Sequence, residues 1–120
     1  MPELPTVDPH AIESLRALSP DGDGSFLREL VEIYLQDTPQ RLAELEAALA
    51  GGDAPVAMRA AHSIKGSSSN FGAARLAKLA QEIETLSKDG NCEAARALAP
   101  VLRGEFLQVA QALNRIAPGS

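Results

Sequence analysis

The sequence predicts an all-α protein, an antiparallel four-helix bundle with one or two additional N-terminal helices. Apolar residues recur at helical spacing along most of the 120-residue chain, and no segment alternates with a period of two. Hydrophobic residues make up 45% of the chain but include only three Phe, one Tyr and no Trp, so the core must be largely aliphatic. The predicted loops are short, which makes consecutive helices antiparallel.

The N-terminal part of the chain carries two helix start signals and one break. Asp8 followed by Pro9 predicts a cap and first turn of a short helix, and Ser25 is expected to cap a second one. Thr38 and Pro39 interrupt the apolar pattern because proline lacks an amide hydrogen. They are predicted to end the second helix and to open a separate one, which makes the four-helix bundle start near residue 38.

The remaining helices follow from caps and glycine breaks. Asp53 is expected to cap a helix that ends before Gly72, and further helices follow to about Leu86 and over residues 92–116. Residues 8–116 are therefore expected to form one domain, with flexible ends at 1–7 and 117–120, where Pro and Gly are frequent. The helix after Asp53 presents its apolar face through Ala57, Ala60, Ala61, Ile64, Ser68 and Phe71.

The charge and composition of the chain argue against several classes of function. The net charge of −5 and the pI near 4.9 argue against non-specific binding to nucleic acid or to an anionic membrane. Residues 1–58 hold three basic and eleven acidic side chains, whereas residues 59–120 hold eight and five. The single cysteine, Cys92, excludes an internal disulfide and fits a reducing compartment. No apolar run is long enough to span a membrane. We expect a cytoplasmic monomer.

The segment "AAHSIKGSSS" at residues 60–69 is the strongest candidate site. His62 is two residues from Ile64, about 200° around a helix, so it is predicted to face solvent. Lys65 and Gly66 follow at i+3 and i+4 on the same face. Glycine in a helix interior costs about 1 kcal/mol relative to alanine, so a glycine inside this helix would indicate that space is needed beside His62. A nucleophilic imidazole, a nearby cation and a clear approach are typical of phosphoryl transfer to a side chain.

A structural interpretation is also open. Lys65 and Gly66 resemble an ordinary helix C-terminus, with a cation in the last turn and glycine just after it. His62 would then be an ordinary surface residue. The spacing alone does not decide between these interpretations.

The wider segment resembles the histidine-containing phosphotransfer (HPt) domain of bacterial and eukaryotic phosphorelays. That family's pattern is Ala-His-x-Ile/Leu-Lys-Gly-Ser/Ala, small residues, an apolar residue, Gly and a Leu-rich helix. The resemblance covers roughly residues 24–116. The matching positions are Ala61, His62, Ile64, Lys65, Gly66, Ser67, Ser68, Phe71, Gly72, Leu76 and Ile83.

The resemblance implies that His62 accepts a phosphoryl group from the aspartyl phosphate of a receiver domain and passes it to another. Lys65 would steady the phosphoryl group, and Gly66 would give steric access. Glu84 stands 22 residues after His62, where the family often has glutamine. Its carboxylate could fix the tautomer of the imidazole, or it could repel the phosphoryl group and be only a solvated neighbour. Both remain open here.

The implied partners are response-regulator receiver domains, a hybrid sensor histidine kinase, or both. The receiver would supply Mg²⁺, and we expect no metal or cofactor bound by this chain, whose only histidines are His10 and His62. The absence of a P-loop or kinase-type glycine loop predicts that the protein is not an enzyme with an ATP site of its own.

The expected docking surface is Met58, Ala61, Ser69 and Ala77. The alternative is a helical adaptor that binds a receiver or kinase domain without being phosphorylated.

Overall fold

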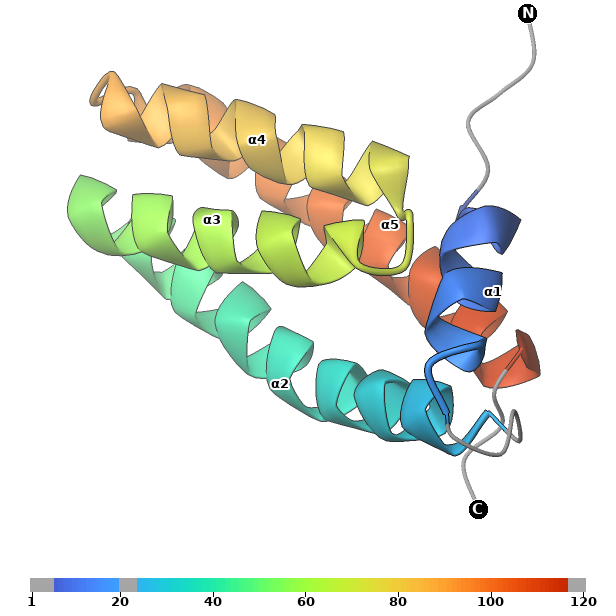
Figure 1. Cartoon of the computed structure of the whole chain (residues 1–120). Helices are drawn as coiled ribbons and strands as arrows, with labels where there is room; N and C mark the ends of the chain where they lie inside the picture. The colour runs from blue at the N-terminus through green and yellow to red at the C-terminus, as the bar shows by residue number, and fades with distance from the viewer. Residues whose placement is uncertain (1–5, 20–23, 117–120) are drawn as a thin grey trace, which may run out of the picture.

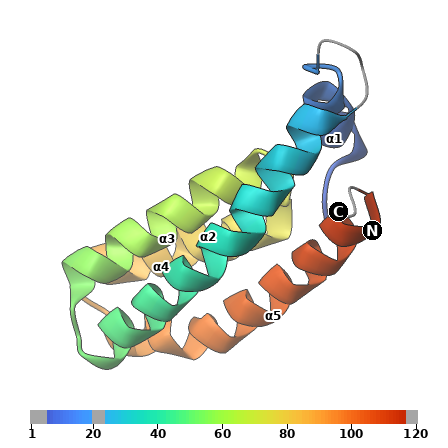
Figure 2. The same ribbon diagram turned by 90° about the horizontal axis from the view of Figure 1, so that it is seen from below.

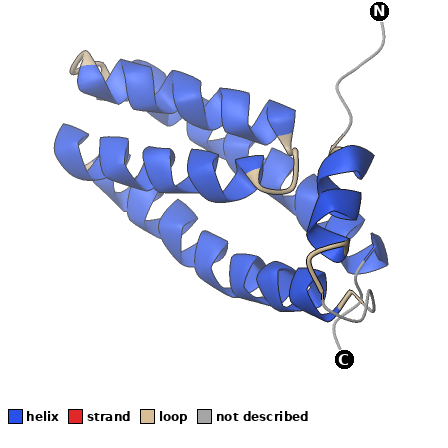
Figure 3. Cartoon of the chain, viewed as in Figure 1, coloured by secondary structure: helices blue, strands red, loops and turns tan. Residues whose placement is uncertain are grey.

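The computed structural model describes residues 6–19 and 24–116, and all regular structure in these ranges is helical (Figure 3). The all-α prediction is therefore confirmed. The described helices are α1 (Pro9–Arg16), α2 (Ser25–Ala50), α3 (Ala54–Ser69), α4 (Ala74–Lys88) and α5 (Cys92–Ile116).

Helices α2 to α5 form an antiparallel four-helix bundle (Figure 1). Each packs against two neighbours, since α3 contacts α2 and α4, while α5 contacts α4 and α2. The helix α1 lies at one end of the bundle, beside the start of α2 and the end of α5 (Figure 2). The described chain thus has one additional N-terminal helix, and α3 is held between α2 and α4.

The predicted break at Thr38 and Pro39 is wrong, because α2 is one continuous helix from Ser25 to Ala50. Pro39 removes one helical hydrogen bond. Packing outweighs this loss, since the apolar stripe keeps its phase on both sides of Pro39 and Thr38 is only 1% exposed within it. The bundle therefore begins at residue 25 rather than 38. The stripe of α2 comprises Leu27, Val31, Tyr34, Thr38, Leu42, Leu45 and Leu49.

The start of α2 also differs from the prediction. Gly24, in the left-handed region, takes the N-cap position, and Ser25 is the first helical residue. A more distant serine satisfies a free amide of the first turn, because Phe26 N donates to Ser19 Oγ over 2.9 Å. The helix start is thus tied to the end of the preceding segment.

The ordered N-terminal part extends further than predicted. Val7 is buried in the core, and Thr6 Oγ1 accepts a hydrogen bond from Arg75 Nη2 at 3.0 Å. Asp8 N donates to Phe71 O in the α3–α4 turn, where Gly72 has a φ of +66°. A Cβ on Gly72 would lie 2.3 Å from the Cβ of Asp8, so only glycine allows this approach. Thr6 and Val7 are therefore not part of a flexible end; residues 1–5 and 117–120 lie outside the described ranges.

A buried hydrogen bond connects α2 to α3. Tyr34 Oη and Ser68 Oγ are 2.8 Å apart, and both residues are buried. The ring of Tyr34 also packs against Phe71 and Phe106, with centroid distances of 5.0 and 5.7 Å. Burial raises the pKa of Tyr34 to about 12, against the smaller opposing effect of the Ser68 hydrogen bond. The tyrosine therefore stays neutral at any physiological pH and fixes α3 in register against α2.

We predict that Tyr34→Phe lowers the free energy of unfolding by about 1–2 kcal/mol, because it leaves the Ser68 hydroxyl buried without this partner. Urea denaturation followed by circular dichroism measures this loss. The double variant Tyr34→Phe/Ser68→Ala should lose less than the sum of the two single losses. Strictly additive losses would show that the two hydroxyls are not coupled.

Candidate functional site

The helix α3 forms as predicted and presents His62 to solvent. Asp53 occupies its N-cap and accepts a hydrogen bond from Val56 N at 3.3 Å. The predicted apolar face is buried throughout its helical part, with Ile64 completely covered. His62 lies on the opposite face, and its side chain is 67% exposed. The exposure predicted from its angular distance to Ile64 is confirmed.

The structure decides between the two interpretations of Gly66. The helix continues past it to Ser69, so Gly66 lies in the helix interior and is not a C-terminal cap. A Cβ built on Gly66 meets no atom within 4 Å, so neither packing nor backbone conformation requires glycine here. The fold therefore gains nothing from glycine at this position.

Four side chains from α3 and α4 form a polar cluster, which we call the His62 cluster: His62, Lys65, Gln81 and Glu84. The Nδ1 atom of His62 is 3.2 Å from Oε2 of Glu84. Lys65 Nζ donates to Oε1 of the same carboxylate at 2.7 Å and to Gln81 Oε1 at 2.8 Å. Glu84 is the centre of the cluster, because one of its oxygens faces the imidazole and the other faces the ammonium group.

The charge state of Glu84 follows from this geometry. Partial burial acts to raise the pKa of its carboxyl, but the hydrogen bond and charge of Lys65, with a further contribution from His62, hold the pKa below its ordinary value. Glu84 is therefore ionised near neutral pH and can only accept hydrogen bonds. The contact with His62 then requires a proton on Nδ1, which leaves the lone pair of a neutral ring on Nε2.

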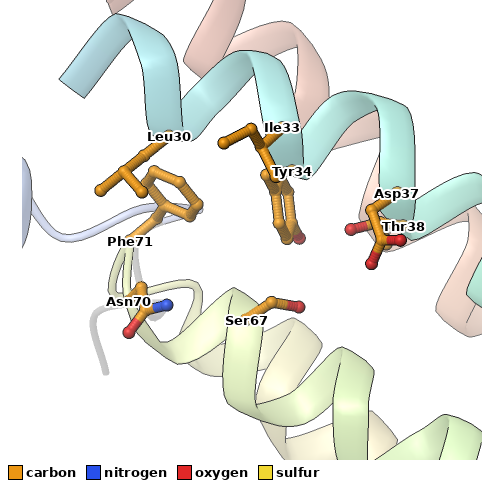
Figure 4. A pocket seen from close by; sticks show the side chains of 8 residues that line it. All are labelled: Leu30, Ile33, Tyr34, Asp37, Thr38, Ser67, Asn70 and Phe71. Carbon is orange, nitrogen blue, oxygen red and sulfur yellow. The ribbon is translucent and has the colours of Figure 1, made fainter. Parts of the chain in front are cut away.

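The cluster opens into a shallow hollow beside His62. This hollow of about 310 Å³ is lined by Met58, Arg59, His62, Ser63 and Glu84. A different pocket, of about 110 Å³, lies between α2 and the end of α3 (Figure 4). It is mostly apolar, Asp37 is the only carboxylate in its lining, and no nucleophile in it is paired with a base. Of these two hollows, the one beside His62 therefore holds an imidazole in contact with a carboxylate.

Comparison with known sequences agrees with this placement. The profile of the Hpt domain family matches residues 29–116, which is most of the chain and includes the whole His62 cluster. The chain belongs to the Hpt domain family.

Two relatives of this Hpt domain are informative. The phosphorelay intermediate protein rdeA from Dictyostelium discoideum is 30% identical over 94 residues. That match covers 78% of this chain but only 37% of the relative, so the chain spans little more than a third of its length. The crystal structure of histidine-containing phosphotransfer protein B from Pseudomonas aeruginosa PAO1 superposes with a TM-score of 0.86 at 32% identity. The superposition covers 96% of both chains.

Of the four residues expected to dock a partner, three are at least partly exposed and one is buried. The prediction that Ala61 belongs to the docking surface is wrong, because this residue is completely buried in the apolar face of α3. Met58 lines the hollow next to His62, and Ser69 is exposed near the end of α3. The Ser69 hydroxyl donates to Lys65 O at 2.8 Å, so it is occupied within its own helix. Ala77 is partly exposed on α4, one turn before Gln81.

Sequence reasoning missed Gln81. Its side chain holds Lys65 in place at 2.8 Å, yet it lies outside the motif around His62. The signal was available in the spacing, because Gln81 precedes Glu84 by three residues and therefore shares its helix face.

Two searches of the described residues had negative results. No helix within residues 6–19 and 24–116 is both long and apolar enough to cross a membrane. In the same ranges, no group of three or more His, Cys, Asp or Glu side chains is placed to hold a metal ion.

We predict that Lys65→Met raises the pKa of the Glu84 carboxyl, because the variant removes the strongest stabilisation of the ionised form. Carbon-detected NMR titration of labelled glutamate measures both proteins. The pair stabilises the wild type above the pKa that Glu84 has in the unfolded chain. This stabilisation is lost as the pH falls through the lower pKa of the folded state. An unchanged Glu84 titration would show that Lys65 does not hold the carboxylate in solution.

Proposed function

We propose that this Hpt domain is a phosphorelay intermediate in which Nε2 of His62 accepts a phosphoryl group from an aspartyl phosphate and passes it to a second receiver. The observation that carries the proposal is the exposed imidazole whose Nδ1 faces an ionised carboxylate. Family membership and the printed role of rdeA as a phosphorelay intermediate support it.

The geometry supports a simple transfer step. The lone pair on Nε2 attacks phosphorus, a nitrogen–phosphorus bond forms, and the bond from phosphorus to the aspartyl oxygen breaks, so that aspartate leaves as a carboxylate. The ring keeps its proton on Nδ1 and becomes cationic as the new bond forms. Glu84, 3.2 Å from Nδ1, then lies against the developing positive charge. Transfer to the next receiver reverses these changes and restores the neutral ring.

The position of Lys65 reduces the expected electrostatic repulsion between Glu84 and the phosphoryl group. Its ammonium group is 2.7 Å from Glu84 Oε1, so the carboxylate and the ammonium balance one another beside the ring. The negative charge of Glu84 is thus directed at Nδ1 and offset on its other side. We therefore assign Lys65 two contributions, holding Glu84 in its ionised orientation and reducing the repulsion of the arriving phosphoryl group.

Gly66 and the surrounding surface fit an approaching protein. The space above Gly66 is open, and α3 contains no acidic side chain along its length. An acidic site on a receiver therefore meets no like charge on this helix. We propose Met58, Ser69 and Ala77 as parts of the docking surface, with receiver domains or a hybrid sensor kinase as partners. The receiver is expected to bring Mg²⁺, and this chain is expected to use no ATP.

We predict that phosphorylated receiver domains label the wild-type protein and not His62→Gln. The expected label is stable in base and labile in acid, as a phosphoramidate bond is. Transfer from a panel of radiolabelled receivers to purified protein measures this. No label from any receiver would favour the adaptor function, and label retained by His62→Gln would exclude His62 as the acceptor.

We predict that Gly66→Arg slows phosphotransfer by at least about tenfold while the fold is kept, because the side chain projects into open solvent where the partner must approach. Gly104→Arg is the matched control, since Gly104 lies inside α5 with equally open surroundings. Circular dichroism and transfer kinetics on both variants measure the effect. Equal transfer rates for the two would show that Gly66 has no role in access.

A further inference from the structure

Arg59 occupies a position in the hollow that the proposed transfer step does not yet use. It precedes His62 by three residues, so the two lie on the same face of α3 one turn apart. Side chains on a helix lean toward its N-terminus, and the imidazole therefore extends over the turn that carries Met58 and Arg59. All three residues line the same hollow of about 310 Å³.

The other cation near the ring is already engaged. Lys65 directs two N–H donors at Gln81 and Glu84, at 2.8 and 2.7 Å, and its charge is balanced by the Glu84 carboxylate. Arg59 differs in both respects. It is exposed, and among residues 6–19 and 24–116 no side chain forms a hydrogen bond or ion pair with its guanidinium group.

The chemistry of the hollow matches an anion attached to Nε2. Because Nδ1 faces Glu84, the other ring nitrogen points away from that carboxylate. A guanidinium group presents paired N–H donors that fit two oxygens of a phosphoryl group, and such bonds are stronger than those between neutral groups. Ser63 adds a hydroxyl to the same lining, and Glu84 adds a carboxylate that faces Nδ1.

We propose that Arg59 binds the phosphoryl group on His62 by donating hydrogen bonds to its oxygens. The proposal rests on the proposed function, because it assigns a binding residue to the phosphorylated state. Arg59 supplies positive charge for the phosphoryl oxygens, while the charge of Lys65 is balanced by Glu84.

The test uses phosphoramidate, a small phosphoryl donor that needs no docking partner. The background variant His10→Gln leaves His62 as the only histidine. In this background, ³¹P NMR follows the titration of the phosphoryl group on His62 in the parent protein, in Arg59→Ala and in Arg115→Ala. Arg115 is the matched control, an exposed arginine in the last turn of α5 near α1.

We expect the phosphoryl group of the parent to lose its proton at a pH about half a unit lower than in Arg59→Ala, because a nearby cation favours the dianion. Arg115→Ala should titrate like the parent. The difference should shrink at 1 M salt, where exposed charges are screened. Identical titrations of the parent and Arg59→Ala would overturn the proposal, as would an equal shift in Arg115→Ala.

The outcomes also separate this proposal from the proposed function. Label transferred by receivers, together with a titration that does not depend on Arg59, would overturn only the role of Arg59. A shift in Arg59→Ala without transfer from any receiver would support the binding site and count against the relay. If phosphoramidate left His62 unlabelled, the same titrations would be made on protein phosphorylated by a receiver, and identical titrations of the parent and Arg59→Ala would overturn the proposal.

Discussion

The contact between His62 and Glu84 depends on how closely α3 and α4 approach each other. The two residues are 22 positions apart and belong to antiparallel helices joined by a short turn. The buried face of α3 carries Ala57, Ala60 and Ala61, and small residues at a helix interface shorten the distance between helix axes. Larger side chains here would move Glu84 away from the ring. The alanine residues on this face therefore allow α4 to lie close enough to α3 for Glu84 to contact His62.

The site combines a stable support with an unobstructed surface. Below the exposed face of α3, Tyr34 and Ser68 connect the helix to α2. Above it, Gly66 leaves open space, and the 67% exposed imidazole is restrained by a single carboxylate. Such a site needs little of its own machinery, because phosphohistidine and aspartyl phosphate are both reactive and the protein mainly has to orient one nitrogen.

Much of this could be predicted from the sequence, and each failure has a physical cause. Helical periodicity correctly predicted that His62 is exposed, because the angle between His62 and Ile64 around the helix axis depends only on helix geometry. The predicted break at Pro39 was wrong because it rested on the local effect of proline alone. The apolar stripe keeps its helical phase through residues 27–49 and holds the helix together. Ala61 was assigned to the docking surface although it shares the apolar face of Ile64. The role of Glu84 stayed open because tertiary packing decides which side chains meet across α3 and α4.

The central claim is that Glu84 holds the proton of His62 on Nδ1 and leaves Nε2 as the nucleophile. ¹⁵N NMR of protein labelled in the histidine ring tests it most directly, with the ring observed before and after phosphorylation. The account predicts a protonated Nδ1 in the neutral ring and a ¹⁵N–³¹P coupling at Nε2 in the phosphorylated form. A neutral ring protonated on Nε2, or phosphorus attached to Nδ1, would contradict it.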